Sequence, residues 1–155
     1  MDLFTKLREM KMLLVEDDKW IRDSLRLFFQ GEGCHLSTFE SAEEGLAVLE
    51  DETYDIIMSD YRLPGMDGLA FLERIQTSHP EARTILMTAY GNEKLLSKAK
   101  RMGVNAFIEK PFTSDVVEES LRRIMDPQEK QKTSHALEAQ TGNKSGRDMR
   151  SDQRG

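Results

Sequence analysis

Four short apolar segments of this 155-residue chain each end in residues that can do chemistry. These residues are the carboxylates Glu16, Asp17 and Asp60, the hydroxyl of Thr88 and the ammonium of Lys110. Singly, each has an ordinary structural explanation, since acidic residues often cap helices, threonines often occupy turns and lysines usually lie at the surface. Their joint occurrence at four segment ends indicates a common site.

Three carboxylates held close together repel one another. Two of them about 4 Å apart repel by about 1 kcal/mol in water and about 4 kcal/mol at a surface-like dielectric. A hard divalent cation relieves this repulsion, and Mg²⁺ (or Mn²⁺) suits one or two carboxylates together with waters and a phosphate oxygen. The acidic residues therefore predict a cation site that lacks only a phosphoryl group.

The phosphoryl group itself is expected to be attached covalently. The sequence has neither the glycine-rich loop of P-loop proteins nor that of dinucleotide-binding proteins, so a bound nucleotide is not expected. Asp60 can act as a nucleophile through its carboxylate. In-line transfer spreads charge over the phosphoryl oxygens, which can be stabilised by the cation, the Lys110 ammonium, the Thr88 hydroxyl and the Ala89 amide.

A parallel sheet would bring these residues together. Apolar runs without alternation are typical of strands buried on both faces, and a more mixed run indicates an edge strand. The apolar runs are Lys11–Val15, Ile56–Ser59, Thr84–Met87 and Ala106–Ile108, and the mixed run is Cys34–Phe39. Helical patterns lie among them at Ile21–Phe29, Ala42–Leu49, Leu69–Ile75, Leu95–Met102 and Val117–Ile124. This alternation predicts an α/β fold, a doubly wound five-stranded parallel sheet with five helices, in which ligands bind beyond the carboxyl ends of the strands.

Capping residues support several of these helices. Ser41 with Glu44 forms a capping box, and Asp67 and Asn92 are predicted N-caps. Gly103 lies where a helix-ending glycine is expected. These residues define the expected beginnings of three helices and the end of one.

Composition and charge exclude several classes of protein. One cysteine excludes a disulfide scaffold and a cluster of thiolate metal ligands within the chain, and no apolar run approaches the ~20 residues of a membrane span. Met1–Met10 has no secretory signal pattern, which together with the lone cysteine predicts a cytoplasmic protein. The net charge of −6 argues against charge-driven binding of nucleic acid.

The charge is unevenly distributed along the chain. It amounts to −8 up to Asp126 and +2 beyond, where only four of 29 residues are apolar. Such a segment cannot bury enough apolar surface to offset the entropy of ordering it. We therefore expect an N-terminal extension at residues 1–9, one domain at residues 10–126, and a disordered or linker-like tail at residues 127–155.

As a set, these motifs resemble the receiver domain of bacterial two-component response regulators, chemotaxis receivers included. The matching stretches are Met12–Asp18, Asp60–Gly68, Leu86–Ala89 and Lys110–Phe112, in the family's order and spacing. The similarity covers about residues 10–125. It implies the flavodoxin-like strand order 2-1-3-4-5.

The resemblance implies a role for each acidic residue. Asp60 would be the phosphoacceptor. Asp17 and Asp60 would hold Mg²⁺ with Glu16 acting through water, and the backbone carbonyl of Arg62 would complete the metal shell. Asp18 falls one place beyond the acidic pair, so we expect it to begin the following helix rather than to bind metal.

The resemblance also implies how a phosphoryl group would be bound and detected. Thr88, Lys110 and the Ala89 amide would contact the phosphoryl oxygens. Thr88 would switch together with the ring of Phe107. A cis peptide bond before Pro111 would aim the Lys110 side chain.

Two positions that vary in the family each lie two residues after a key residue. They are Arg62, after Asp60, and Tyr90, after Thr88. Such positions influence the lifetime of the phosphoryl group in this family by shaping the access of water. An aromatic ring at Tyr90 would shield an acyl phosphate, and an exposed loop side chain is an equally good interpretation of this residue.

The resemblance implies a phosphorylatable switch and not an enzyme with a separate substrate. A histidine kinase or histidine phosphotransfer protein would donate to Asp60, and the receiver would catalyse only this transfer and its own dephosphorylation. Phosphorylation would alter the surface of the fourth predicted helix (Leu95–Met102), the fifth strand (Ala106–Ile108) and the fifth helix (Val117–Ile124). A homodimer would form through this surface. A kinase would dock on the first predicted helix, the one with the apolar pattern Ile21–Phe29. Its charged residues are expected to be exposed: Lys19, Arg22, Asp23 and Arg26. No direct contact of this chain with a membrane or nucleic acid is expected.

Two alternative functions have less support. A phosphatase with an aspartate nucleophile needs a second acid two residues after it, where this chain has Arg62. A non-phosphorylated binding module of receiver shape would not need the complete set of site residues. No output-domain pattern follows Asp126, so we expect either a stand-alone receiver or the receiver part of a longer regulator.

Overall fold

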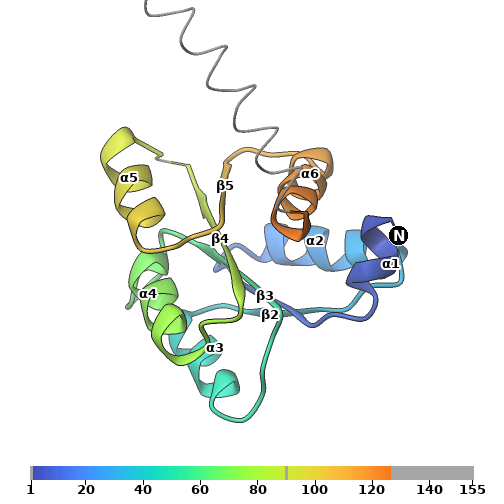
Figure 1. Ribbon diagram of the computed structural model, residues 1–155, viewed down its shortest axis with the longest axis horizontal. Coiled ribbons are helices and arrows are strands. Elements are labelled where there is room, and N and C mark those ends of the chain that lie inside the picture. Colours follow the sequence, from blue (N-terminus) through green and yellow to red (C-terminus); the bar gives the residue numbers. More distant parts are fainter. Residues whose placement is uncertain (1, 90, 127–155) are drawn as a thin grey trace, which may run out of the picture. The chain divides into compact units, whose positions relative to one another are not determined.

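The computed structural model describes residues 2–89 and 91–126 (Figure 1). The chain divides into two compact units, Met1–Ser120 and Leu121–Gly155, and every site discussed below lies in the first. The expectations for Tyr90 and for the tail at residues 127–155 fall outside the described residues.

Within the described residues, five parallel strands form one sheet. They are β1 (Met12–Val15), β2 (Leu36–Phe39), β3 (Ile56–Asp60), β4 (Arg83–Thr88) and β5 (Ala106–Glu109). Their order, β2-β1-β3-β4-β5, confirms the predicted doubly wound topology (Figure 1). The edge strand β2 begins two residues later than expected, because the Cys34 N–H still bonds to the Phe29 carbonyl at the end of the preceding helix, at 2.8 Å.

The register of the sheet aligns the ends of the central strands. Val15 of β1 pairs with Ser59 of β3, and Asp60 pairs with Met87 of β4. Thr88, the next residue of β4, pairs with the last residue of β5. The residues that follow these strands therefore leave the sheet along one edge, where ligands of open α/β sheets bind.

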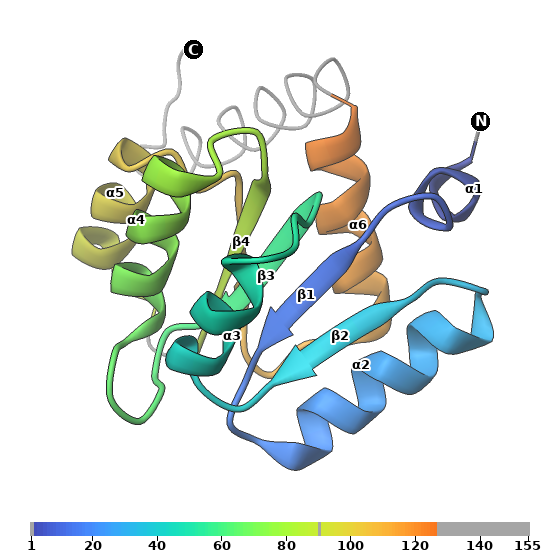
Figure 2. The same ribbon diagram turned by 90° about the horizontal axis from the view of Figure 1, so that it is seen from below.

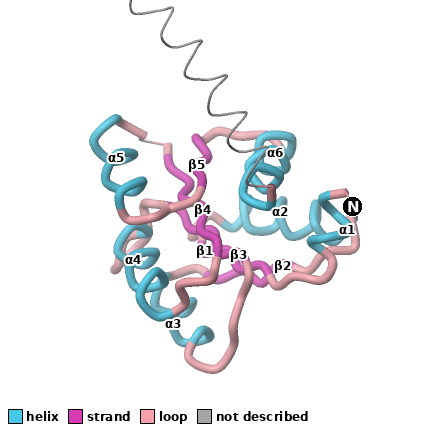
Figure 3. Tube along the Cα trace, in the orientation of Figure 1, coloured by secondary structure: helices cyan, strands magenta, loops and turns pink. Residues whose placement is uncertain are grey.

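Six helices accompany the strands in the part of the chain that the structure describes. They are α1 (Leu3–Leu7), α2 (Lys19–Gly31), α3 (Ala42–Leu49), α4 (Gly68–Ser78), α5 (Glu93–Arg101) and α6 (Ser114–Met125). Helices α3, α4 and α5 lie on one face of the sheet, and α2 lies on the other with the beginning of α6 (Figures 2 and 3). Across the same residues, no helix combines the length and apolar character needed to cross a membrane.

The prediction of five helices misses α1, which lies in the expected N-terminal extension. Asp2 caps this helix by accepting a 3.0 Å hydrogen bond from the Thr5 N–H, and Leu3 and Leu7 are buried. A helix of five residues shows only one repeat of the apolar spacing, so periodicity cannot distinguish it from a loop.

Both faces of the sheet are covered by apolar side chains. Leu13 and Ile57 belong to the core cluster beneath α3, α4 and α5. Side chains alternate along a strand, and the intervening Leu14 and Met58 are fully buried on the other face, where α2 contributes Phe29. The carboxyl edge of the sheet remains as the place where polar side chains can gather.

The predicted caps are confirmed. Ser41, Asp67 and Asn92 each accept a hydrogen bond from a backbone N–H in the first turn of α3, α4 and α5, at 3.2, 2.8 and 2.8 Å. The Glu44 carboxylate bonds to the N–H of the residue before Ser41, so the capping box is displaced by one residue. Gly103 follows α5 with a φ of 94°, a conformation that favours glycine.

Candidate functional site

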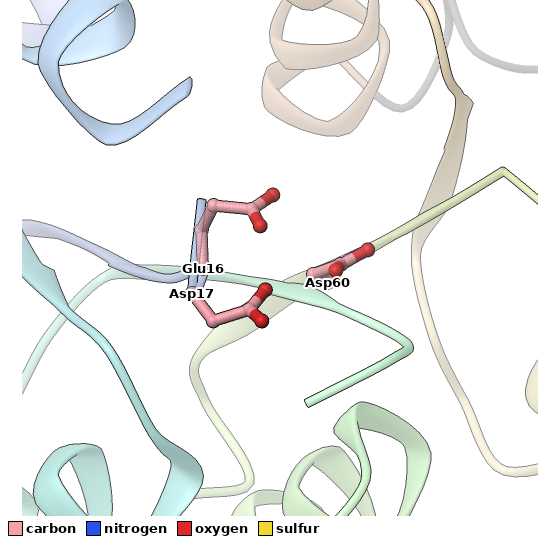
Figure 4. Close-up of side chains that lie close together, drawn as sticks. All are labelled: Glu16, Asp17 and Asp60. Atoms are coloured by element: carbon pink, nitrogen blue, oxygen red, sulfur yellow. The ribbon is translucent and has the colours of Figure 1, made fainter. Parts of the chain in front are cut away.

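Three carboxylates meet at the carboxyl edge of the sheet. Glu16 and Asp17 follow β1, Asp60 ends β3, and one oxygen from each lies within 4.8 Å of the other two (Figure 4). Glu16 and Asp60 are buried, whereas Asp17 is exposed. The cluster therefore has a buried side and a side open to solvent.

Lys110 completes this cluster. Its Nζ lies 2.7 Å from Oε1 of Glu16 and 3.2 Å from Oδ1 of Asp60. Lys110 follows β5, and the peptide bond that joins it to Pro111 is cis, as the resemblance implies. One ammonium is thus shared by two buried carboxylates that belong to different strands.

Burial dominates the electrostatics of the cluster. It raises the pKa of Glu16 from its ordinary value of 4.5 to about 7, although the hydrogen bond from Lys110 acts in the opposite direction. Burial likewise raises the pKa of Asp60 against the effect of Lys110. Burial alone would lower the pKa of Lys110, but the hydrogen bond and charge of Glu16, with the charge of Asp60, outweigh it and raise this pKa. Burial and, to a smaller extent, repulsion between neighbouring carboxylates therefore disfavour ionisation of Glu16 and Asp60, and an added cation would offset this effect.

Hydrogen bonds hold the loop between β1 and α2. The N–H of Asp18 donates to Oε2 of Glu16 at 3.1 Å, and Nη1 of Arg22 donates to the Glu16 carbonyl at 2.8 Å. The Asp18 carboxylate accepts from the Trp20 N–H at 2.8 Å and caps α2, which confirms that it begins the helix.

Arg22 does not lie on an exposed docking face, in contrast to the expectation from sequence. Its side chain is only 12% exposed, because it reaches back to the sheet edge. Lys19 and Arg26 remain on the surface and pair with Asp23 at 2.7 and 2.6 Å. The signal for burial is helical position, since Arg22 precedes the buried Leu25 by three residues on the same face of α2.

Gly68 is a site residue whose role is not predicted from the sequence. A Cβ atom at this position would collide with the backbone carbonyl of Asp60, and the Gly68 N–H donates to the Tyr61 carbonyl at 2.8 Å. The first residue of α4 therefore packs directly against the end of β3. The Asp67–Gly68 pair signals a helix start in sequence, but this contact depends on the tertiary structure.

The remaining predicted residues lie at or near the same edge. Thr88 ends β4 and is buried, and Ala89 follows it exposed. Arg62 is exposed and shares a cavity of about 460 Å³ with Asp17. Phe107 lies on β5, partly buried against the core beneath α5. Their contacts with a phosphoryl group or metal, and the Thr88–Phe107 switch, stay predictions.

Comparison with known proteins identifies the family. The response regulator receiver domain matches residues 12–122 of this chain. The chain belongs to this family. The DNA-binding transcriptional regulator NtrC of Salmonella typhimurium is 35% identical to this receiver over 125 residues, which are 81% of this chain and 27% of NtrC. Sporulation initiation phosphotransferase F of Bacillus subtilis is 32% identical over 117 residues, which are 74% of this chain and 93% of that protein.

Solved receiver structures agree with this assignment. A CheY-like receiver domain protein from Methanospirillum hungatei superposes with a TM-score of 0.72 and 30% identity, covering 79% of this chain and 98% of that one. A CheX–CheY–BeF3–Mg²⁺ complex from Borrelia burgdorferi gives a TM-score of 0.72 and 27% identity, covering 76% and 90%. The chain spans about a quarter of the length of the NtrC regulators that it matches.

The residues of this receiver fit the magnesium ion that the family implies. Glu16, Asp17 and Asp60 offer only oxygen ligands, which hard divalent cations prefer. Three carboxylates gather around the single ammonium of Lys110, so the ionised cluster carries negative charge that Lys110 alone does not balance. These three residues would hold the cation.

An apolar groove adjoins the site of the receiver. It has a volume of about 460 Å³ and lies between α2 and the segments that follow β4 and β5. Its lining includes Trp20, Ile21, Phe28, Ala89, Lys110 and Phe112. Trp20 is 83% exposed, which is unusual for so large an apolar side chain. Sequence patterns do not reveal this groove, because its walls come from segments about 90 residues apart.

Proposed function

We propose that this receiver accepts a phosphoryl group on Asp60 from a phosphohistidine of a histidine kinase or histidine phosphotransfer protein, in a reaction that requires Mg²⁺. The observation that carries the proposal is the ammonium of Lys110, which lies 2.7 Å from Glu16 and 3.2 Å from Asp60 in a mostly buried acidic cluster. The similarity to phosphotransferase F and to a CheY complex with BeF3 and Mg²⁺ supports it.

The chemistry of the transfer follows from the residues at the site. A carboxylate oxygen of Asp60 attacks the phosphorus, and an O–P bond forms as the P–N bond of the phosphohistidine breaks. The electron pair of the P–N bond leaves with the imidazole of the donor. Lys110 and the Thr88 hydroxyl stabilise the charge on the phosphoryl oxygens. Glu16, Asp17 and Asp60 would hold the Mg²⁺, which would supply further positive charge to these oxygens.

In this proposal the receiver acts on its own aspartate and on no separate substrate. The position two residues after Asp60, where an aspartate-nucleophile phosphatase needs an acid, is the exposed basic residue Arg62. Attack of water on the acyl phosphate would release inorganic phosphate and restore Asp60. The proposed activity is therefore self-phosphorylation from a donor followed by self-dephosphorylation.

The apolar groove is the surface that we propose for the histidine-bearing partner. Ala89 and Lys110 belong both to the groove and to the phosphoacceptor site, so a protein seated there would present its histidine next to Asp60. Exposed Trp20 at the groove favours an apolar surface on that partner. This face of α2 replaces the charged one that the sequence predicts for kinase docking.

The output of the switch is proposed at β5 and α5. Thr88 is buried at the end of β4, and Phe107 lies partly buried on the neighbouring strand. Movement of the Thr88 hydroxyl toward a phosphoryl group would free space for the Phe107 ring and alter this surface. The homodimer implied by the resemblance stays a prediction.

Labelling with acetyl phosphate tests the proposed chemistry. We expect one phosphoryl group on the wild-type chain in the presence of Mg²⁺ and none in EDTA, as measured by intact mass. Asp60→Asn should remain unlabelled, whereas Asp51→Asn, at an exposed aspartate outside the acidic cluster, should be labelled like the wild type. Labelling of Asp60→Asn at the wild-type rate would refute the assignment.

A further inference from the structure

The N-terminal helix α1 packs against the end of α2 although it lies outside the residues that match the receiver family. Leu3 and Leu7 are buried, and Nε of Arg8 donates to the Glu32 carbonyl at 2.8 Å. The thiol of Cys34 lies 3.9 Å from the Phe4 carbonyl. Apolar burial and polar contacts thus fix α1 to the segment that joins α2 to β2.

A chain of aromatic rings connects α1 to the groove. The ring of Phe4 meets the ring of Phe28 edge to face, with centroids 6.0 Å apart at 70°. Phe28 meets Phe29 in the same way at 5.1 Å and 71°, and Phe29 is fully buried. Phe28 also lines the groove, as Lys110 does. Its ring is therefore held between a core residue of α2 and a residue of α1.

We propose that α1 supports the partner-docking surface of this receiver from outside the groove, and that Phe4 is a positioning residue which holds the Phe28 ring at the wall of the groove. The occupant of the groove is the histidine-bearing phosphodonor protein, so this inference rests on the proposed function. Phe4 lines neither the groove nor the acidic cluster. It acts only through Phe28.

This role differs in its consequences from simple stabilisation of the fold. Acetyl phosphate needs only the phosphoacceptor site with its Mg²⁺, so its reaction with Asp60 does not depend on the wall of the groove that Phe28 forms. A protein donor needs the groove as well. Loss of the Phe4 ring should therefore weaken the binding of a protein donor without changing the chemistry at Asp60.

The experiment compares Phe4 variants of the full chain with two donors. One is acetyl phosphate. The other is the radiolabelled phosphohistidine protein that phosphorylates the wild-type chain fastest in a panel of histidine kinases and histidine phosphotransfer proteins. For Phe4→Ala we expect the donor-protein concentration that gives half the maximal transfer rate to rise by roughly three- to tenfold. This is the factor that corresponds to the free energy of an aromatic pair. The maximal transfer rate and the acetyl phosphate rate should stay unchanged.

Further variants separate positioning from folding. Phe4→Leu keeps the apolar bulk without the ring and should behave like Phe4→Ala, whereas Phe4→Tyr keeps the ring and should restore the wild-type requirement. Glu9→Ala alters an exposed residue between α1 and β1 and serves as the control. Thermal melting of each variant shows whether it is folded at the assay temperature.

Three results would overturn the inference. The first is an unchanged donor-protein requirement in both Phe4→Ala and Phe4→Leu. The second is a fall in the acetyl phosphate rate of Phe4→Ala by the same factor as the loss of transfer from the donor protein, which would show a general loss of structure. The third is a wild-type chain that acetyl phosphate labels but no donor protein does. Failure of both donors to label wild-type Asp60 would refute the proposed function instead.

Discussion

Lys110 and Glu16 lie 94 positions apart in the sequence and form a 2.7 Å ion pair whose carboxylate is fully buried. A buried ion pair compensates only part of the hydration that its two charges lose. Protonation of a carboxylate, binding of a cation and phosphoryl transfer to Asp60 would therefore each change the charge of the same poorly hydrated cluster.

The metal-free protein should lose stability as the pH rises. Glu16 has an ordinary pKa of 4.5 and a folded-state pKa of about 7, so the unfolded chain ionises first and is favoured across this interval. Asp60 acts with the same sign because its pKa is also raised. Lys110 does not contribute there, since its pKa is raised from 10.5. Urea denaturation in EDTA at several pH values measures the free energy of unfolding.

Glu16→Gln provides the comparison for this pH dependence. The glutamine cannot ionise, so the decline in stability between pH 4.5 and about 7 should become shallower than in the wild type. An identical decline in both proteins would show that the Glu16 carboxyl group does not titrate as the structure indicates.

Mg²⁺ should raise the melting temperature of the wild-type protein, and Asp17→Asn should abolish the rise. A ligand at about 100 times its dissociation constant stabilises the folded state by about 2.7 kcal/mol. Asp18→Asn is a matched control, because the neighbouring side chain caps α2 and asparagine caps helices as well as aspartate does. Differential scanning fluorimetry with increasing Mg²⁺ measures the response. A full response in Asp17→Asn would remove this residue from the cation site.

Gly68→Ala should destabilise the protein and slow labelling by acetyl phosphate. The new Cβ would collide with the Asp60 carbonyl, and overpacking of this kind costs about 1–3 kcal/mol. Gly31→Ala is the control, since a Cβ at that helical position meets nothing within 4 Å. Urea denaturation and the labelling rate test both effects. Wild-type stability and labelling in Gly68→Ala would mean that the backbone contact with Asp60 is not restrictive.

Trp20→Ala should weaken docking of a phosphohistidine donor protein without changing the acetyl phosphate rate. Trp20 lines the groove, and a central aromatic contact at an interface often contributes about 2 kcal/mol or more, roughly a thirtyfold rise in the half-saturating donor concentration. Leu27→Ala removes a side chain of the same helix that is 67% exposed but lies outside the groove. Equal effects of the two substitutions would indicate that the donor contacts α2 without using the groove.

Strand positions and the acidic cluster are predictable from this sequence because both depend on short local patterns. Apolar runs mark the strands, and parallel strands place the residues after them at one edge. The shared edge is sufficient to predict that Glu16, Asp17 and Asp60 lie together, and their positions confirm it. The assignment of Lys110 to the same cluster follows from the same reasoning and is confirmed by its distances.

The features that the sequence does not reveal depend on contacts between distant segments. The place of Arg22 on the buried face of α2 follows from its spacing to Leu25, but its hydrogen bond to the Glu16 carbonyl does not. Gly68 belongs to a turn-like pair, and its contact with Asp60 requires α4 to lie against β3. Helix α1 is too short for periodicity and becomes visible only through its packing on α2. Local pattern carries no information on any of these contacts.

The register of the sheet also has a consequence for how the protein folds. Glu16, Asp60, Thr88 and Lys110 converge only when β1, β3, β4 and β5 are all paired, and every one of these pairings is non-local in sequence. Non-local pairings are slow to form because loop closure must precede them. A refolding chain with complete helices but one unpaired central strand would have no phosphoacceptor site. Acetyl phosphate labelling would therefore count fully assembled molecules and ignore compact intermediates, which makes it a stringent probe of refolding.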